Sequence, residues 1–228
     1  MTTLAAEGIN KRYQRAGCDF YAVKEVDLVV EQGDFVVITG HSGSGKSTLL
    51  NMLAGLLRPD SGSVRLGGQD LTEFSDTALA LLRATNIGYI PQGRTILDNF
   101  SVLDNICLPY DLAHQRQQGK TLVQEKAYDL LSLVGISHLL DERPHNLSGG
   151  EQRRVAIARS LINEPDILIA DEPTSDLDPT TTNAIMDLFE KIHREGTTVI
   201  MVTHDWGLTR YATVGFTMLK GLLIEGNA

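Results

Sequence analysis

The segment Gly40-His41-Ser42-Gly43-Ser44-Gly45-Lys46-Ser47 matches the phosphate-binding pattern G-x-x-x-x-G-K-[ST] at every fixed position. An apolar run, 35–39, precedes it and predicts a buried strand, while residues 46–54, which include Thr48, predict a helix. The glycines let successive backbone N–H groups converge on a phosphate, and the helix N-terminus adds partial positive charge. Lys46 is expected to neutralise the β- and γ-phosphates, and the Ser47 hydroxyl to ligate Mg²⁺. The segment therefore predicts an α/β fold with a nucleotide site between a strand and a helix.

Two adjacent acids follow a second apolar run, 167–170. Asp171, at the carboxyl end of this expected strand, would face the phosphate-binding loop, where a carboxylate helps to hold Mg²⁺. Glu172 would point to the other side of the strand and polarise an attacking water as a general base. The pair predicts hydrolysis of the bound nucleotide, with Lys46 and Glu172 as catalytic residues.

The composition is that of an ordinary globular protein: 228 residues, 42% hydrophobic and 21% charged, with a formal net charge of −9. An acidic chain repels phosphate backbones, so we expect no nucleic acid as the main partner. Cys18 and Cys107 lie in no metal-binding spacing and predict two reduced thiols. We expect no signal peptide, and no apolar run approaches the ~20 residues of a membrane span, so a membrane role needs another subunit.

Short β-rich runs alternate with helix-period segments, which indicates a mostly parallel sheet wrapped by helices. Ser101 and Asp104 form a capping-box-like helix start, and residues 185–192 carry the i, i+3, i+4, i+7 spacing of a buried helix face. The middle third, roughly residues 93–160, is almost entirely helical in pattern. Besides those already given, strands are expected over 26–30, 64–66, 87–90 and 198–202, and helices over 76–84 and 120–134.

A second anion-binding helix end is expected at Leu147-Ser148-Gly149-Gly150-Glu151-Gln152. Ser148 is a good N-cap, and the two glycines leave the first N–H groups of the helix uncovered. A well-capped helix alone explains the serine but not two helix-weakening glycines in series. This segment resembles the signature segment of ABC transporter ATPases.

The other motifs of that family follow in order. Gln92 resembles the Q-loop glutamine, which also implies a metal-ligand role, and His204 resembles the catalytic switch histidine. Ser175-Asp176-Leu177-Asp178 resembles the D-loop, with Asp176 in place of the usual small residue. Tyr13 resembles the aromatic residue that stacks on adenine, with Tyr21 as the neighbouring alternative. Pro91 stands where an aromatic residue is common.

The resemblance covers essentially the whole chain and is strongest to ATPases of the lipoprotein-releasing, macrolide-export and cell-division type, through segments 22–26, 60–64 and 101–106. It implies ATP and Mg²⁺ as cofactors, and one ABC ATPase domain over residues 2–228. Residues 1–91 and 165–228 would form a P-loop core with an antiparallel β subdomain, and about 93–163 a helical signature subdomain.

The resemblance also implies partners. Two anion-binding helix ends in one chain fit a head-to-tail dimer in which each ATP lies between the P-loop of one copy and the signature of the other. The second partner would be an integral-membrane permease with a large extracytoplasmic domain, placing the chain at the cytoplasmic face of the inner membrane.

Three alternatives to an export or extraction ATPase remain at this point. The first is a mechanical signalling module that drives an envelope hydrolase without transport. The second is a soluble ABC ATPase that acts on DNA or ribosomes, which the single cassette and the acidic charge disfavour. The third is a P-loop kinase, which would not need residues 147–152.

Overall fold

Two sheets enclose helix α1 (Lys46–Leu53) in the computed structural model, which describes residues 2–15, 17–93, 95–114 and 120–226. Sheet B has six strands in the order β10-β9-β3-β8-β7-β6, all parallel except the β9–β10 hairpin. The strands of sheet B are β3 (Phe35–Thr39), β6 (Ile87–Ile90), β7 (Ile167–Asp171), β8 (Thr198–Thr203), β9 (Val214–Leu219) and β10 (Leu222–Gly226).

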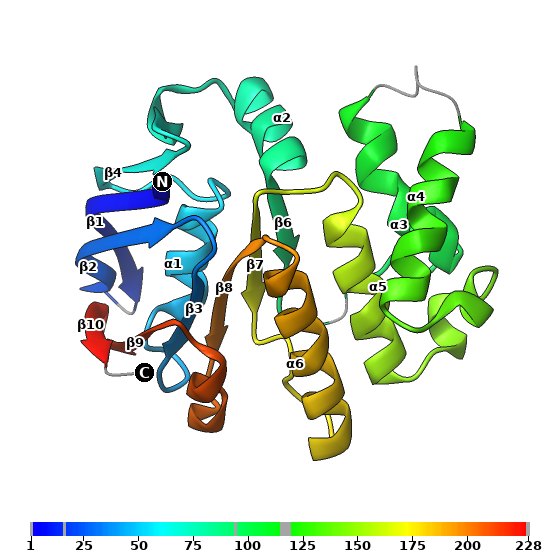
Figure 1. Cartoon of the computed structure of the whole chain (residues 1–228). Coiled ribbons are helices and arrows are strands. Elements are labelled where there is room, and N and C mark those ends of the chain that lie inside the picture. The colour runs from blue at the N-terminus through cyan, green and yellow to red at the C-terminus, as the bar shows by residue number, and fades with distance from the viewer. Residues whose placement is uncertain (1, 16, 94, 115–119, 227–228) are drawn as a thin grey trace.

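The central strands of sheet B are buried along their whole length because both faces of the sheet are covered. Alternate residues point to opposite faces. Val36 and Ile38 pack with α1 and sheet A, whereas Phe35 and Val37 pack toward the helices on the other face. Figure 1 shows α1 between the two sheets and α6 (Pro179–Arg194) on the opposite side of sheet B.

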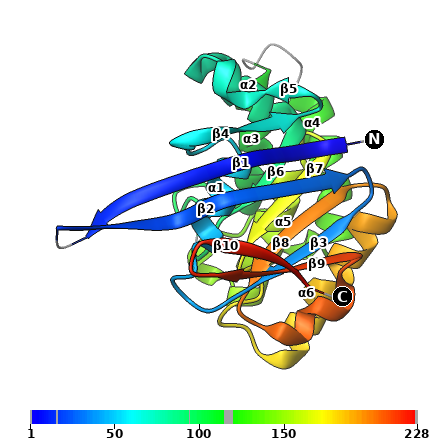
Figure 2. The same cartoon turned by 90° about the vertical axis from the view of Figure 1, so that its left-hand side faces the viewer.

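Sheet A is antiparallel and is built on one long hairpin. Its strands are β1 (Thr2–Arg15), β2 (Cys18–Glu31), β4 (Ser61–Leu66) and β5 (Gln69–Asp70), in the order β2-β1-β4-β5. In Figure 2 the β1–β2 hairpin projects well beyond the rest of the molecule. The second half of β2 alternates buried and exposed residues, since only one of its faces packs on α1.

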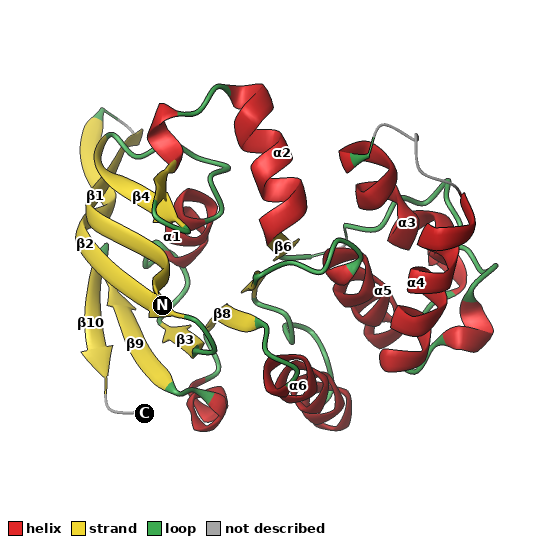
Figure 3. Ribbon diagram, turned by 45° about the horizontal axis from the view of Figure 1, so that its top comes forward, coloured by secondary structure: helices red, strands yellow, loops and turns green. Residues whose placement is uncertain are grey.

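Three helices form a separate group beside sheet B, as Figure 3 shows. These are α3 (Val102–Ala113), α4 (Lys120–Leu133) and α5 (Gly149–Leu161). Helix α2 (Asp76–Asn86) lies between β5 and β6 in sequence. Single turns of 3₁₀-helix cover Leu71–Glu73, Ser137–Leu139 and Pro144–Asn146, and a longer one covers Trp206–Tyr211. Among the described ranges no helix combines the length and apolar character that crossing a bilayer requires.

The predicted fold class is confirmed: a P-loop α/β core with an antiparallel sheet and a group of helices. The capping box of Ser101 and Asp104 is present, and the strand over 87–90 has the predicted bounds. The sequence reasoning missed β1, β9 and β10, and its strand over 26–30 is the last part of the longer β2. Cys18 and Cys107 are both free thiols, the first exposed and the second buried.

Candidate functional site

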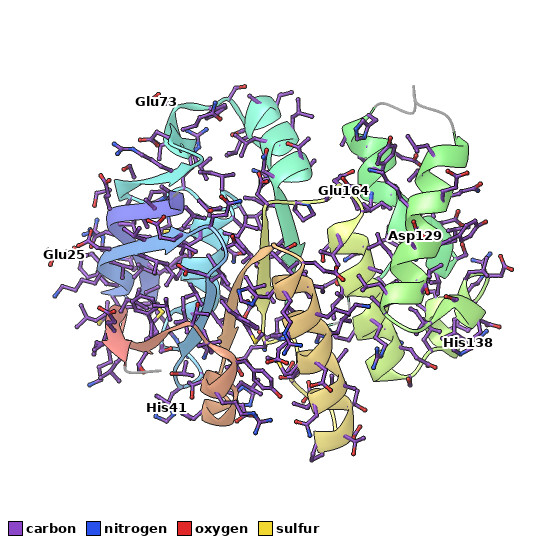
Figure 4. The ribbon with its side chains drawn as sticks, in the orientation of Figure 1. Glu25, His41, Glu73, Asp129, His138 and Glu164 are labelled. Atoms are coloured by element: carbon purple, nitrogen blue, oxygen red, sulfur yellow. The ribbon has the colours of Figure 1, made fainter. Side chains whose placement is uncertain are left out.

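The phosphate-binding loop joins β3 to α1, and its shape depends on glycine. Gly45, the residue before α1, has a φ of 109°, which side-chain-bearing residues rarely adopt. A Cβ on Gly45 would also collide with the carbonyl oxygen of Ala22 on β2. The Ser44 hydroxyl is buried and has no hydrogen-bond partner among the described residues. The loop therefore contains a buried polar group whose hydrogen bonding is unsatisfied. His41 follows β3 at the lower edge of the molecule in Figure 4.

Lys46 folds back over this loop. Its ammonium donates to the carbonyl oxygens of Gly40, at 2.7 Å, and His41, at 3.2 Å. The Nζ atom lies 3.6 Å from Oε1 of Glu172, and both side chains are more than nine-tenths buried. Lys46 is the positive charge at the centre of the site, and phosphate oxygens entering the loop would find it within reach.

Asp171 ends β7 and is only 3% exposed. Burial raises the pKa of its carboxyl above the ordinary 3.8, while the Ser47 hydroxyl and the charge of Lys46 oppose that rise. Its Oδ1 atom has no hydrogen-bond partner among the described residues. A buried carboxylate oxygen left open beside a hydroxyl is a donor pair that Mg²⁺ favours. Asp171 and Ser47 therefore fit the predicted metal site.

Glu172 has partners different from those of Asp171. Its φ of 50° turns the chain just after β7, and its backbone N–H donates to the Val202 carbonyl at 3.0 Å. Oε2 accepts from the backbone N–H of His204, at 3.2 Å, and lies 2.8 Å from its ring Nδ1. Parallel strands β7 and β8 end at the same edge, which is why residues 32 apart in sequence meet. Glu172 thus stands between the lysine and the histidine.

A cavity of about 540 Å³ opens over these groups. Tyr13 and Gln92, which the sequence predicts to bind ATP, line it, and so does Phe20, which the sequence reasoning missed. Tyr13 and Phe20 are directly opposite in the β1–β2 ladder, so both side chains leave the same face, with ring centroids 6.1 Å apart. Tyr21, the alternative aromatic residue, is not among the lining residues. No sequence signal identified Phe20, because the long strand register that pairs it with Tyr13 was not predicted.

The signature segment lies apart from this cavity. Ser148 caps α5 in a full capping box: its Oγ accepts from Glu151 N–H, and the Glu151 carboxylate accepts from Ser148 N–H and Oγ, both at 2.7 Å. These bonds lower the pKa of Glu151. A Cβ on Gly150 would lie only 2.7 Å from the Thr181 side chain of α6, so packing against α6 favours glycine at this position. A Cβ on Gly149 would make only ordinary contact, so packing does not require that glycine.

The predicted D-loop follows Glu172. Asp178 is the N-cap of α6 and accepts from the backbone N–H groups of Thr180 and Thr181. The hydrogen bond from the Thr181 hydroxyl, followed by these backbone bonds, lowers the pKa of Asp178. Asp176 is exposed and has a φ of 62°. Asp178 thus has a structural role at the start of α6, while Asp176 is held in a left-handed turn.

The predicted site residues therefore fall into two groups that lie in different places on the chain. The P-loop, Asp171, Glu172, His204, Gln92 and Tyr13 lie together at the carboxyl ends of β3, β7 and β8. Ser148 to Glu151 and the D-loop aspartates do not line that cavity.

The fold and this site define a P-loop nucleotide-binding protein: a glycine loop at a helix start, a buried lysine and a strand-end carboxylate. The protein-family model described as "ABC transporter" matches residues 23–175 of the sequence. The chain therefore belongs to the ABC transporter family. It is an ATP-binding cassette with ATPase activity.

Curated relatives cover nearly the whole chain. The lipoprotein-releasing system ATP-binding protein LolD of Hyphomonas neptunium is 40% identical over 96% of this chain and 95% of its own length. The macrolide export ATP-binding/permease protein MacB of Chlorobaculum tepidum is 39% identical over 95% of this chain, which spans only 33% of that relative. The methionine import protein MetN of Bordetella avium is 42% identical over 90% of this chain and 56% of its own length.

Solved structures agree in fold. The dimeric, ADP- and phosphate-bound ATP-binding cassette MJ0796 superposes with a TM-score of 0.91, at 32% identity and 98% coverage of both chains. A cassette titled CbiO1 from Clostridium perfringens, part of a transporter complex, gives a TM-score of 0.85 at 31% identity over 99% of this chain and 88% of its own.

Proposed function

We propose that this chain is the ATP-hydrolysing subunit of a transporter that exports or extracts a substrate through a separate membrane permease. The observation that carries the proposal is the cluster of Lys46, Glu172 and His204 around one cavity, with Asp171 buried beside Ser47 and the signature helix end elsewhere on the same chain. The LolD and MacB relatives support release or export, and MacB unites ATP-binding and permease parts in one longer chain.

In the proposed reaction, ATP lies on the P-loop with its base against Tyr13 and its γ-phosphate between Lys46 and His204. Glu172 accepts a proton from a water whose oxygen attacks the γ-phosphorus, the bond to the bridging oxygen breaks, and ADP and phosphate leave. Lys46 offsets the charge on the transferred group. When bound, Mg²⁺ would be held by Ser47, Asp171 and Gln92 and would neutralise phosphate oxygens.

A second copy completes the site in this proposal. Ser148 and Gly150 of one copy would meet the γ-phosphate in the P-loop of the other, so that ATP favours a closed head-to-tail dimer and phosphate loss releases it. The MJ0796 cassette, whose solved structures are dimeric, supports the formation of a dimer. Gln92 and a helical subdomain over about residues 93–163 would pass the motion to a permease with a large extracytoplasmic domain, at the inner face of the membrane.

The deciding variant is Glu172→Gln, with Glu73→Gln, an exposed carboxylate far from the cavity, as its matched control (Figure 4). We expect hydrolysis to fall at least ~100-fold in Glu172→Gln, because a general base is lost, while MgATP still binds. Turnover should be unchanged in the control. Sedimentation with excess MgATP should show a dimer of Glu172→Gln. Near-normal turnover would remove Glu172 from its role, and a strict monomer with and without the permease would refute the shared site.

A further inference from the structure

A buried arginine lies where three parts of the site meet. Arg153, on α5, is only 8% exposed, and a guanidinium carries five N–H donors. Its Nη1 donates one hydrogen bond, at 3.4 Å, to the carbonyl oxygen of Pro91, the residue before Gln92. Among the described residues no carboxylate lies within ion-pairing distance of Arg153. A buried cation with one long hydrogen bond is costly, because little replaces its lost hydration.

Arg153 lines a cavity of about 250 Å³. One wall is Thr95 and Ile96, beyond Gln92, and a second is the first part of α5, including Gly149. The third wall is the D-loop, with Asp176. The buried Arg153 and the exposed Asp176 thus line the same cavity.

Among the residues that line this cavity, Asp176 carries the carboxylate that can form an ion pair with Arg153. Burial lowers the pKa of Arg153, and the negative charges of Asp176 and Asp171 oppose that effect, Asp176 more strongly. Asp171 already faces Ser47 and Lys46. Asp176 sits in a left-handed turn with a φ of 62°, a conformation that aspartate and asparagine tolerate better than most residues. Because both residues line this cavity, a turn of the Asp176 carboxylate into it would bring the carboxylate toward Arg153.

We propose that Arg153 is a positioning residue that pairs with Asp176 when ATP closes the dimer, and so locks the D-loop to the signature helix. This inference rests on the proposed function, because each chain would then serve two ATP sites. Arg153 is five residues after Ser148, which serves the partner's ATP, and Asp176 is four residues after Glu172, which serves the chain's own ATP. The ion pair therefore connects the two sites of the dimer through one chain.

A double-mutant cycle tests the pair in the full-length chain. Arg153→Gln removes the charge but keeps an amide donor for the Pro91 carbonyl, and Asp176→Asn removes the charge while keeping the shape and the left-handed turn. Asp129→Asn, an exposed carboxylate on α4 (Figure 4), is the matched control. We expect either single variant to lower kcat about three- to tenfold, with the Kd for ATP within about twofold of the original. The double variant should lose no more than either single, and the control nothing.

Arg153→Lys separates charge from packing. It keeps the cation, and we expect at least half of the original kcat, a rescue that a merely structural role of the guanidinium would not give. Independent losses that multiply in the double variant, or unchanged kcat in Asp176→Asn, would overturn the pairing. If the pairing is overturned in either way but Glu172→Gln still shows the expected ~100-fold loss, the ATPase proposal stands. An active Glu172→Gln would instead refute the proposed function itself.

Discussion

Replacing Asp171 by asparagine should stabilise the free protein while weakening its binding of MgATP. Asp171 is 3% exposed, and its Oδ1 has no hydrogen-bond partner among the described residues. Burial is the largest cause of its raised pKa, so the ionised carboxylate is disfavoured in the folded chain. A buried, unsatisfied polar group costs about 1–3 kcal/mol, and more when charged. Removing the charge should therefore recover about 1 kcal/mol, which raises Tm by about 2–4 °C in a domain of this size.

The assay is thermal unfolding of the protein in EDTA, paired with equilibrium binding of ATP with and without Mg²⁺. Ser47→Ala is the matched control, because it removes another proposed metal ligand without removing a buried charge. Both variants should lose the Mg²⁺-dependent part of ATP binding, and only Asp171→Asn should gain stability. A lower Tm for Asp171→Asn, or Mg²⁺-dependent binding equal to the original, would refute the reasoning from the open carboxylate oxygen.

Two further predictions concern the edges of the site. Phe20→Leu should weaken ATP binding about five- to tenfold, since base–aromatic contacts contribute about 1–3 kcal/mol. The control Tyr21→Leu should leave ATP binding unchanged. Equal losses of affinity in the two variants would contradict a role of the Tyr13–Phe20 pair in binding the base. Ser148→Ala should lower Tm by about 2–4 °C near neutral pH, because an N-cap contributes about 1 kcal/mol. The Ser148 bonds lower the pKa of Glu151, so their stabilisation is present above the ordinary 4.5 and is lost as the pH falls through the lowered pKa. Thermal unfolding at several pH values checks this, and a Tm difference that persists undiminished in acid would contradict it.

Most of the fold was predictable, because local patterns carry it. The buried strands β3, β7 and β8 each contain an unbroken apolar run, and the capping boxes at Ser101 and Ser148 need only residues three apart. The long strand β1 was missed since its sequence is polar and mixed, and its stability comes from pairing with β2 and β4 rather than from its own pattern.

The sequence alone determined the chemistry of the phosphate site: a glycine loop, Lys46 and the acids 171–172 are fixed by spacing along one chain. Only the tertiary structure decided which distant residues join them. His204 reaches Glu172 because β7 and β8 are neighbours. Phe20 reaches the cavity through the register of β1 and β2, and Arg153 shares a cavity with Asp176 because α5 lies beside the D-loop. Strand order, register and helix packing depend on long-range contacts, and no local pattern in the sequence specifies those contacts.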